Sequence, residues 1–190
     1  MDKFFLPESI LAKRISLKRH NPSLAQKMFE YVLEDKERLS RFLPWPKFIN
    51  KVEDEVDFIN KCNDSWDKQE SAHFGIFRNE DNEYLGNITS FSFNWASDSC
   101  EIGYWILGKF EGSGYMTEAV VLLEDTLFKL GFNRIVIRFD PLNDKSGAIP
   151  RRLNYSYEGT LREAIKVDES FRNLEVYSKI KSDLNSIIES

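Results

Sequence analysis

The chain has little cysteine and little histidine, and each shortage narrows what it can do. Its 190 residues include two cysteines, Cys62 and Cys100, which form no Cys-x-x-Cys pattern. Two such thiols favour a reducing compartment over a disulfide framework. The two histidines, His20 and His73, leave few candidates for a histidine-based metal site, so we expect no metal. His20 is predicted to lie at the surface and His73 in a strand.

Long apolar runs and an excess of positive charge are missing too. No hydrophobic stretch approaches the roughly 18 residues of a membrane span, and the N-terminal MDKFFLPESILAKR lacks the pattern of a signal peptide. We therefore expect a cytoplasmic protein without membrane association. Asp and Glu outnumber Lys and Arg by 31 to 26, a net charge of -5. This balance argues against general nucleic-acid binding and is compatible with an amine substrate.

Glycine is scarce as well, but it is clustered. Of nine glycines, three lie within the seven residues Gly108–Gly114, between an apolar run that ends at Leu107 and a helix-periodic run that begins at Met116. Glycines at a strand-to-helix junction allow positive φ and close approach of the backbone to a ligand. The N-terminus of the following helix then favours an anion, most often phosphate. A tight turn without a ligand is the alternative reading of the same residues.

The remaining periodicity predicts one α/β (α+β) domain over residues 1–190, with a mixed, mostly antiparallel sheet of about seven strands flanked by helices. The strand-like segments are 10–19, 73–77, 84–93, 100–107, 134–139, 155–162 and 171–180. The helical segments are 21–41, 51–66, 116–130 and 143–153. The glycine segment follows the fourth strand rather than the first, which excludes a doubly wound dinucleotide fold. No Gly-Lys-Ser/Thr follows the glycines, which excludes a P-loop.

These features resemble the GNAT family of acetyl-CoA-dependent N-acetyltransferases. KFEGSG (Lys109–Gly114) is similar to the family's phosphate loop, (Gln/Arg)-x-x-Gly-x-(Gly/Ala), with Lys109 at the basic position. More narrowly, the chain resembles the RimJ/RimL group, which acetylates the N-termini of ribosomal proteins. The matching stretches, in order, are ERLSRFLPW, EIGYWIL, GSGYMTEAV, NDKSGAIPRRLNYSYEGTLREA and VYSKI. The resemblance implies the GNAT fold and acetyl-CoA as co-substrate. The family commonly forms dimers, and the last strand offers an edge for a homodimer.

The resemblance also implies where acetyl-CoA binds. Backbone amides of the glycine loop would hold the pyrophosphate, and the free edge of the fourth strand would bond to pantetheine through its backbone. The cofactor-binding residues expected on this basis are Trp105, Ile106, Leu107, Lys109, Gly112, Ser113, Gly114, Tyr115, Met116 and Asn143.

Acetyl transfer to an amine needs a neutral amine, a polarised thioester carbonyl and a proton for the departing thiolate. An N-terminal α-amine, with a pKa of about 7.7–8.0, needs only modest help from a base. Glu101 is the first candidate for that base or for its water relay, and a solvated carboxylate at the strand end is the alternative. By resemblance, Ser146 of Asn143-x-x-Ser146 would protonate the thiolate. The same four residues also suit a helix cap.

Two positions depart from the pattern of the group. RimL-like enzymes can carry a glutamate just after Glu-Gly-x-Leu-x-x-Ala, where this chain has Ile165. Neither Glu163 nor Glu158 is a direct match, so the identity of the general base is not assigned. The acceptor can therefore differ from the ribosomal proteins on which the RimJ/RimL group acts. Glu111, directly before Gly112, should weaken anion binding unless it points to solvent.

The acceptor side is predicted from aromatic residues. Phe42, Trp45 and Phe48 would line a cleft for a peptide or a flexible amine, or would belong to the core. The leading function is acetylation of the N-terminal α-amine of a protein or peptide. The alternatives are acetylation of a small amine (a polyamine, an aminoglycoside or an amino-acid-like compound) and a non-catalytic acyl-CoA-binding sensor. Retention of Asn143 and Ser146 argues against the sensor.

Overall fold

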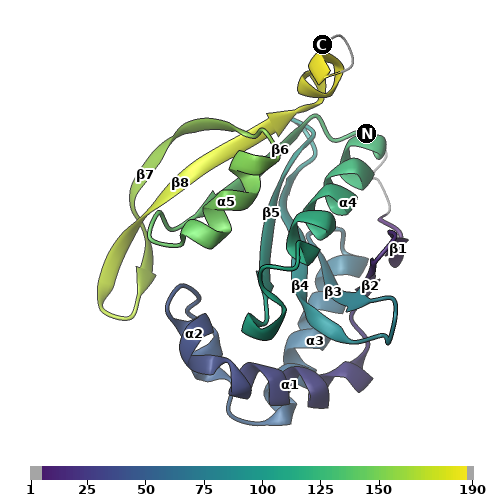
Figure 1. Cartoon of the computed structure of the whole chain (residues 1–190), viewed down its shortest axis with the longest axis vertical. Helices are drawn as coiled ribbons and strands as arrows, with labels where there is room; N and C mark the ends of the chain where they lie inside the picture. Colours follow the sequence, from purple (N-terminus) through teal and green to yellow (C-terminus); the bar gives the residue numbers. More distant parts are fainter. Residues whose placement is uncertain (1–5, 188–190) are drawn as a thin grey trace.

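The computed structural model describes residues 6–187, in which eight strands form one mixed sheet (Figure 1). The order across the sheet is β1-β2-β3-β4-β5-β6-β8-β7, and only β5 and β6 are parallel neighbours. The strands are β1 Ser9–Leu11, β2 Ile15–Arg19, β3 Ala72–Arg78, β4 Tyr84–Asn94, β5 Ser99–Ile106, β6 Arg134–Phe139, β7 Ser156–Val167 and β8 Ser170–Ile180. The predicted mixed, mostly antiparallel α/β sheet is confirmed, with one strand more than expected.

The additional strand arises because the predicted first strand is a hairpin. β1 pairs antiparallel with β2, and the N–H of Ala12 donates to the carbonyl of Ile15 at 2.9 Å across the turn. The side-chain amide of Asn79 donates to the carbonyls of both residues, at 2.9 and 3.2 Å. The turn contains neither glycine nor proline, so its local sequence carries no turn signal.

The helices agree with the predicted segments except for one interruption. They are α1 Ala25–Glu34, α2 Lys36–Ser40, α3 Val52–Asp67, α4 Tyr115–Lys129 and α5 Asp144–Arg152. The predicted first helix is broken at Asp35, which leaves the helical conformation at φ −113°. The Asp35 carboxylate accepts the N–H of Gly108 at 2.9 Å and the Nε–H of Arg38 at 2.8 Å. This break places the short helix α2 against the end of β5.

Helices cover both faces of the sheet (Figure 1). Along β5, Ile102 and Tyr104 belong to the larger apolar cluster, which includes residues of α4 and α5, whereas Trp105 packs with the cluster of α1 and α3. This alternation follows from the period of two along a strand. Strand β5 therefore presents one face to each helical layer, and its end lies between them.

Strands β7 and β8 form a long two-stranded arm that ends beside α2 (Figure 1). Arg172 of β8 donates to the carbonyl of Arg41 at 2.9 Å, and Lys47 pairs with Asp168 at the tip of the arm, at 3.0 Å. These contacts connect the arm to the segment between α2 and α3.

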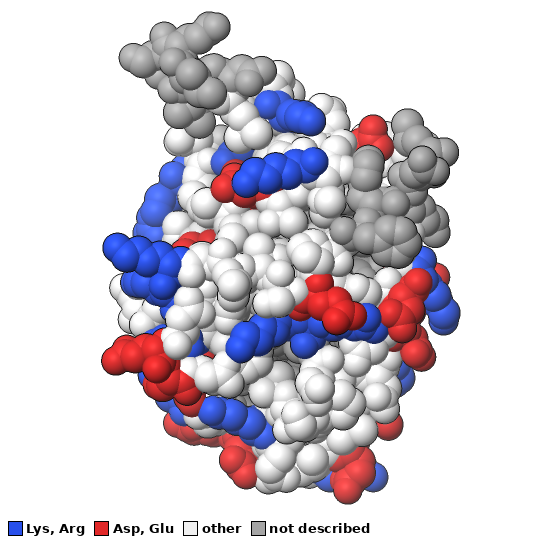
Figure 2. Space-filling view, turned by 90° about the vertical axis from the view of Figure 1, so that its right-hand side faces the viewer, with Lys and Arg blue, Asp and Glu red and all other residues white. Residues whose placement is uncertain are grey.

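The surface shows charges of both signs. On the face that carries β1 and α4, Lys and Arg side chains alternate with Asp and Glu (Figure 2). None of the helices within residues 6–187 is long and apolar enough to cross a membrane.

One histidine prediction is wrong and the other is right. His73 lies in β3 as predicted, but His20, expected at the surface, is 4% exposed. Its Nε2 lies 3.0 Å from Oδ1 of Asn87, and its ring packs beside Phe58 of α3 at 5.8 Å between centroids. The general burial preference of histidine suggested exposure of His20, whereas packing of α3 against the sheet decides its burial.

Replacing Glu55 by glutamine is expected to change how stability depends on pH. Glu55 of α3 is 2% exposed, and burial raises the pKa of its carboxyl from 4.5 to about 7. Between these two values the folded state keeps a proton that the unfolded state has released, so the carboxyl lowers the free energy of unfolding as pH rises. The loss is complete above pH 7 and amounts to about 3 kcal/mol.

Urea denaturation across this pH range measures the effect. Glu55→Gln and the natural chain should have similar stability near pH 4, and the variant should be the more stable near pH 8. Burial lowers the pKa of His20 and His73 to about 4, so both proteins lose stability as pH falls below about 6.5. Since that loss is shared, it cancels in the difference. A difference that does not vary with pH would contradict the assignment.

Candidate active site

Strands β5 and β6 are paired only where both begin. The parallel register joins Ser99, Cys100 and Glu101 to the start of β6, and no pairing continues to the end of β5. A cavity of about 840 Å³ opens beside this separation, within the size range of small-molecule sites. It is lined by Arg38, Leu39, Arg41, Phe42, Leu43, Tyr104, Trp105, Ile106, Phe110, Glu111, Gly112, Gly114, Tyr115, Met116, Thr117, Leu142, Asn143, Asp144, Lys145, Ser146, Ala148, Ile149 and Arg152.

Only some of the backbone groups expected at the free edge of β5 face the cavity, because successive carbonyls along a strand point in opposite directions. The carbonyl of Trp105 faces β4, since a Cβ on Gly86 would lie 2.3 Å from its oxygen. The N–H of Leu107 donates to the carbonyl of Leu85 at 2.9 Å, and Leu107 is 1% exposed and absent from the cavity lining. The carbonyl of Ile106 points the other way, where it accepts from Arg38. Of the three residues expected to bond pantetheine through the backbone, Ile106 is the one with a carbonyl that faces the opening.

The glycine loop has the backbone of an anion site. Gly112 and Gly114 have φ of +75° and +79°, a region in which side chains are disfavoured. Gly114 is the N-cap of α4 and supplies no capping side chain. The N–H of Glu118 donates to the Gly114 carbonyl at 3.1 Å, which is the first hydrogen bond of the helix. The backbone N–H groups that precede Glu118 in the first turn therefore have no acceptor within the helix. No atom lies within 4 Å of where a Cβ on Gly112 would be, so space beside the loop is open. These residues fit the pyrophosphate of coenzyme A.

Only some of the cofactor-binding residues expected around the glycine loop line the cavity. Tyr115 and Met116 line the cavity as predicted. Ser113 is exposed, and its carbonyl accepts from Arg14 at 3.1 Å, which ties the loop to the β1–β2 turn. Lys109 is turned toward α1: its Nζ lies 3.7 Å from the ring centroid of Tyr31 and is absent from the cavity lining. The basic residues that do line the cavity are Arg38, Arg41, Lys145 and Arg152.

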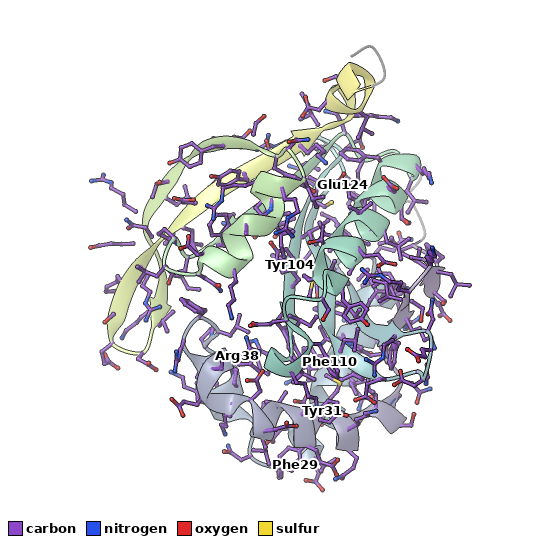
Figure 3. The ribbon with its side chains drawn as sticks, viewed as in Figure 1. Phe29, Tyr31, Arg38, Tyr104, Phe110 and Glu124 are labelled. Carbon is purple, nitrogen blue, oxygen red and sulfur yellow. The ribbon has the colours of Figure 1, made fainter. Side chains whose placement is uncertain are left out.

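Asn143 and Ser146 both lie at the start of α5 and both line the cavity. Oδ1 of Asn143 accepts the backbone N–H of Ser146 at 3.2 Å, so the capping interpretation is correct for this side chain. The cap uses the backbone of Ser146 and leaves its hydroxyl available. Tyr104 of β5 donates its hydroxyl to the Ser146 carbonyl at 2.9 Å and so joins α5 to the free edge of β5 (Figure 3). Tyr104 carries no local sequence signal for this role, because its partner lies 42 residues away in the chain.

Glu101 lies where β5 and β6 separate, and it is not a solvated carboxylate. It is 9% exposed, and both of its oxygens are held by Arg138 of β6, at 2.9 Å from Nε and 2.6 Å from Nη2. It shares a strand face with Trp105, as the alternation predicted. A carboxylate paired in this way can orient a water or an amine, and it is absent from the cavity lining.

The two glutamates near Ile165 do not occupy the expected base position. Glu163 has φ +50° within an irregularity of the β7–β8 register, and its N–H donates to the side chain of Asn173. Hydrogen bonds from Arg134, together with one from Ser178, lower the pKa of Glu158 to about 2. Neither glutamate lines the cavity.

The three aromatic residues of the predicted acceptor cleft have different surroundings. Phe42 lines the cavity. Trp45 packs against Trp105, with 5.5 Å between ring centroids, and so supports the cavity wall from behind. Phe48 is 66% exposed and absent from the cavity lining. Within residues 6–187, no group of three or more His, Cys, Asp or Glu residues is placed to hold a metal ion.

Known acetyltransferases are similar to this chain in sequence and in fold. Residues 14–156, more than half of the chain, match the acetyltransferase (GNAT) domain family. The chain is 27% identical over 174 residues to YdaF of Bacillus subtilis (strain 168), whose name provisionally assigns it to the ribosomal N-acetyltransferases; the match covers 90% of this chain and 93% of YdaF. It is also 23% identical over 154 residues to the ribosomal-protein-serine acetyltransferase of Escherichia coli (strain K12). That match covers 80% of this chain and 85% of the relative.

A solved structure supports the fold. The microcin C7 self-immunity acetyltransferase MccE, in complex with acetyl-CoA and AMP, superposes with a TM-score of 0.87 at 24% identity, covering 94% of this chain and 99% of MccE. The predicted GNAT fold is confirmed, and the predicted resemblance to ribosomal-protein acetyltransferases is confirmed by the two bacterial relatives. The chain therefore belongs to the GNAT family, the acetyl-CoA-dependent N-acetyltransferases.

Proposed function

We propose that the chain transfers the acetyl group of acetyl-CoA to the N-terminal α-amine of a protein or peptide, by direct attack of the amine on the thioester. The observation that carries this proposal is the cavity itself, which extends from the glycine loop to Arg41 and Phe42, beside the β7–β8 arm. A cavity that reaches the segment between α2 and α3, beside the β7–β8 arm, suits the flexible end of a polypeptide. The names of the two bacterial relatives support the same acceptor class.

We propose three roles in the reaction. Ser146 supplies the proton that the departing thiolate takes up, and Asn143 fixes the turn that carries Ser146. Glu101, held by Arg138 and absent from the cavity lining, orients a water that relays to the amine rather than contacting the amine itself. An α-amine requires no strong base, because its pKa of about 7.7–8.0 leaves roughly a quarter of it neutral near physiological pH. We also propose that residues 1–190 act as one acetyltransferase domain, since all eight described strands belong to one sheet.

A small amine is the second candidate acceptor. It is favoured by Ile165, which stands where RimL-like enzymes can carry a glutamate. The two candidates differ in whether residues beyond the acetylated amine contribute to binding.

Acetyl-CoA-dependent thiol release with an acceptor panel tests the proposal. The panel contains peptides that have a free N-terminus and an internal lysine, and the same peptides with the α-amine formylated. It also contains polyamines and aminoglycosides. We expect turnover with the free peptides and none with the formylated ones, with mass spectrometry locating the acetyl group on the α-amine. Turnover with polyamines or aminoglycosides alone would contradict the proposal and favour the second candidate.

Ser146→Ala is expected to lower kcat at least tenfold. This is a lower bound, because a general acid typically contributes about a hundredfold or more. The variant keeps the cap, because Asn143 accepts from the backbone N–H of residue 146 rather than from its hydroxyl. The KM for acetyl-CoA should therefore change little. Ser156→Ala, at the exposed start of β7, is the matched control and should keep full activity. An unchanged kcat in Ser146→Ala would remove the serine from the mechanism.

A further inference from the structure

Glu111 lies between two cations that belong to opposite walls of the cavity. Its Oε1 is 2.7 Å from Nη1 of Arg38 in α2, and its Oε2 is 2.5 Å from Nζ of Lys145 in α5. All three residues line the cavity. The Glu111 side chain is 21% exposed, so it does not point freely into solvent. One carboxylate therefore joins the two helices across the mouth of the site.

Arg38 has a second contact, on the free edge of β5. Its Nη2 donates to the carbonyl of Ile106 at 2.7 Å, and Asp35 holds the rest of the guanidinium. Figure 3 shows Arg38 extending from α2 toward the end of β5. The carbonyl that faces the opening is thus occupied by a side chain from the opposite wall.

The position of Glu111 is unusual for an acid. It directly precedes Gly112, in a loop whose backbone fits a pyrophosphate. An anion beside a phosphate site repels the ligand unless cations neutralise it. Here the two neutralising cations are residues that could bind the same phosphate oxygens, since Arg and Lys are the side chains that bind phosphate.

We propose that Glu111 is an internal substitute for the pyrophosphate of coenzyme A. When coenzyme A binds, Arg38 and Lys145 exchange the Glu111 carboxylate for the incoming phosphates, and the Ile106 carbonyl becomes available to pantetheine. Arg38 and Lys145 are then co-substrate-binding residues in place of Lys109. Glu111 lowers the affinity for coenzyme A, and its effect is confined to ligands that carry the pyrophosphate.

The competing explanation is a permanent brace, in which Glu111 holds α2 and α5 together in the bound state as well. The two explanations predict opposite signs. A brace makes Glu111 necessary for a well-formed cavity, so that its neutralisation weakens binding. A substitute anion competes with the ligand, so that its neutralisation strengthens binding.

Isothermal titration calorimetry with coenzyme A distinguishes them. Glu111→Gln keeps the size of the side chain and removes its charge, and the Kd for coenzyme A should fall about fivefold, the size of one partly exposed ion pair. The Kd for S-acetylpantetheine, which lacks the pyrophosphate, should stay unchanged. Glu34→Gln, which removes a similar exposed pair with Lys109 outside the cavity, is the matched control and should change neither Kd.

A second variant tests the cation. Lys145 is 77% exposed in its side chain, so Lys145→Ala should fold normally. In the Glu111→Gln background, where the competing carboxylate is absent, Lys145→Ala should weaken coenzyme A binding at least threefold. The proposal is overturned if Glu111→Gln leaves the Kd for coenzyme A unchanged or raises it, or if it tightens S-acetylpantetheine equally. An unaltered Kd on adding Lys145→Ala would remove Lys145 from the binding site.

Discussion

Gly114→Ala should weaken acetyl-CoA binding roughly a hundredfold, the loss of one strong hydrogen bond between a backbone amide and a charged group. Gly114 is the N-cap of α4 at φ +79°, and its missing side chain leaves the first-turn amides open to a ligand. A methyl group there meets only Nη2 of Arg14, at 3.5 Å, so the protein itself has room for it. The fold should lose about 1–2 kcal/mol for the left-handed conformation, whereas the ligand loses close access to the amides.

A matched glycine separates these two effects. Gly159 of β7 has φ +144° and no atom within 4 Å of a Cβ position, and it is absent from the cavity lining. Gly159→Ala should therefore lower the free energy of unfolding by at least as much, because φ +144° is less accessible to alanine than the left-handed helical region, and leave the Kd for acetyl-CoA unchanged. Calorimetric titration and urea denaturation of both variants provide the comparison. Equal affinity in Gly114→Ala and the natural chain would mean that the glycine loop is a turn without a ligand.

Lys179→Met should destabilise the fold by about 3–5 kcal/mol, the cost of leaving a buried charge without its partner. Nζ of Lys179 in β8 lies 2.7 Å from Oε1 of Glu124 in α4, and the two side chains are only 7% and 5% exposed. The ammonium also lies 4.8 Å from the ring centroid of Tyr155. Removing the lysine leaves the Glu124 carboxylate in apolar surroundings, which water cannot reach to compensate.

The double variant is the informative control. Glu124→Leu together with Lys179→Met removes both charges, and its stability should return to within about 1 kcal/mol of the natural chain or exceed it. Lys166→Met, which breaks the exposed pair with Glu169, should cost less than about 1 kcal/mol. Urea denaturation at neutral pH measures all three. A double variant as unstable as Lys179→Met would contradict the assignment of the loss to the unpaired Glu124 charge.

The helix and strand order and the glycine loop could be predicted because their signals are local. The residues of β6 were predicted without error, and helix α4 begins one residue from its predicted start at Met116. The positive φ of Gly112 and Gly114 follows from a glycine pair between a strand and a helix, a demand of the backbone alone. The position of Ser146 in the first turn of α5 likewise follows from four consecutive residues.

The direction of individual groups could not be predicted, because it depends on contacts between distant segments. Whether Trp105 or Ile106 turns its carbonyl to the opening depends on pairing with β4, and a shift of one residue reverses the answer. Lys109 matched the family pattern, yet the packing of α1 against the loop directs its side chain to Tyr31.

Local residue patterns were enough for the left-handed glycines, for the family and for the order of the elements, apart from the β1–β2 turn and the break at Asp35. The tertiary structure alone decided that Arg138 holds Glu101 and that Arg38 and Lys145 hold Glu111. The partners in these pairs are 34 to 73 residues apart. Ion pairs over such separations carry no periodicity, so the charges of the site are set by how the helices pack on the sheet.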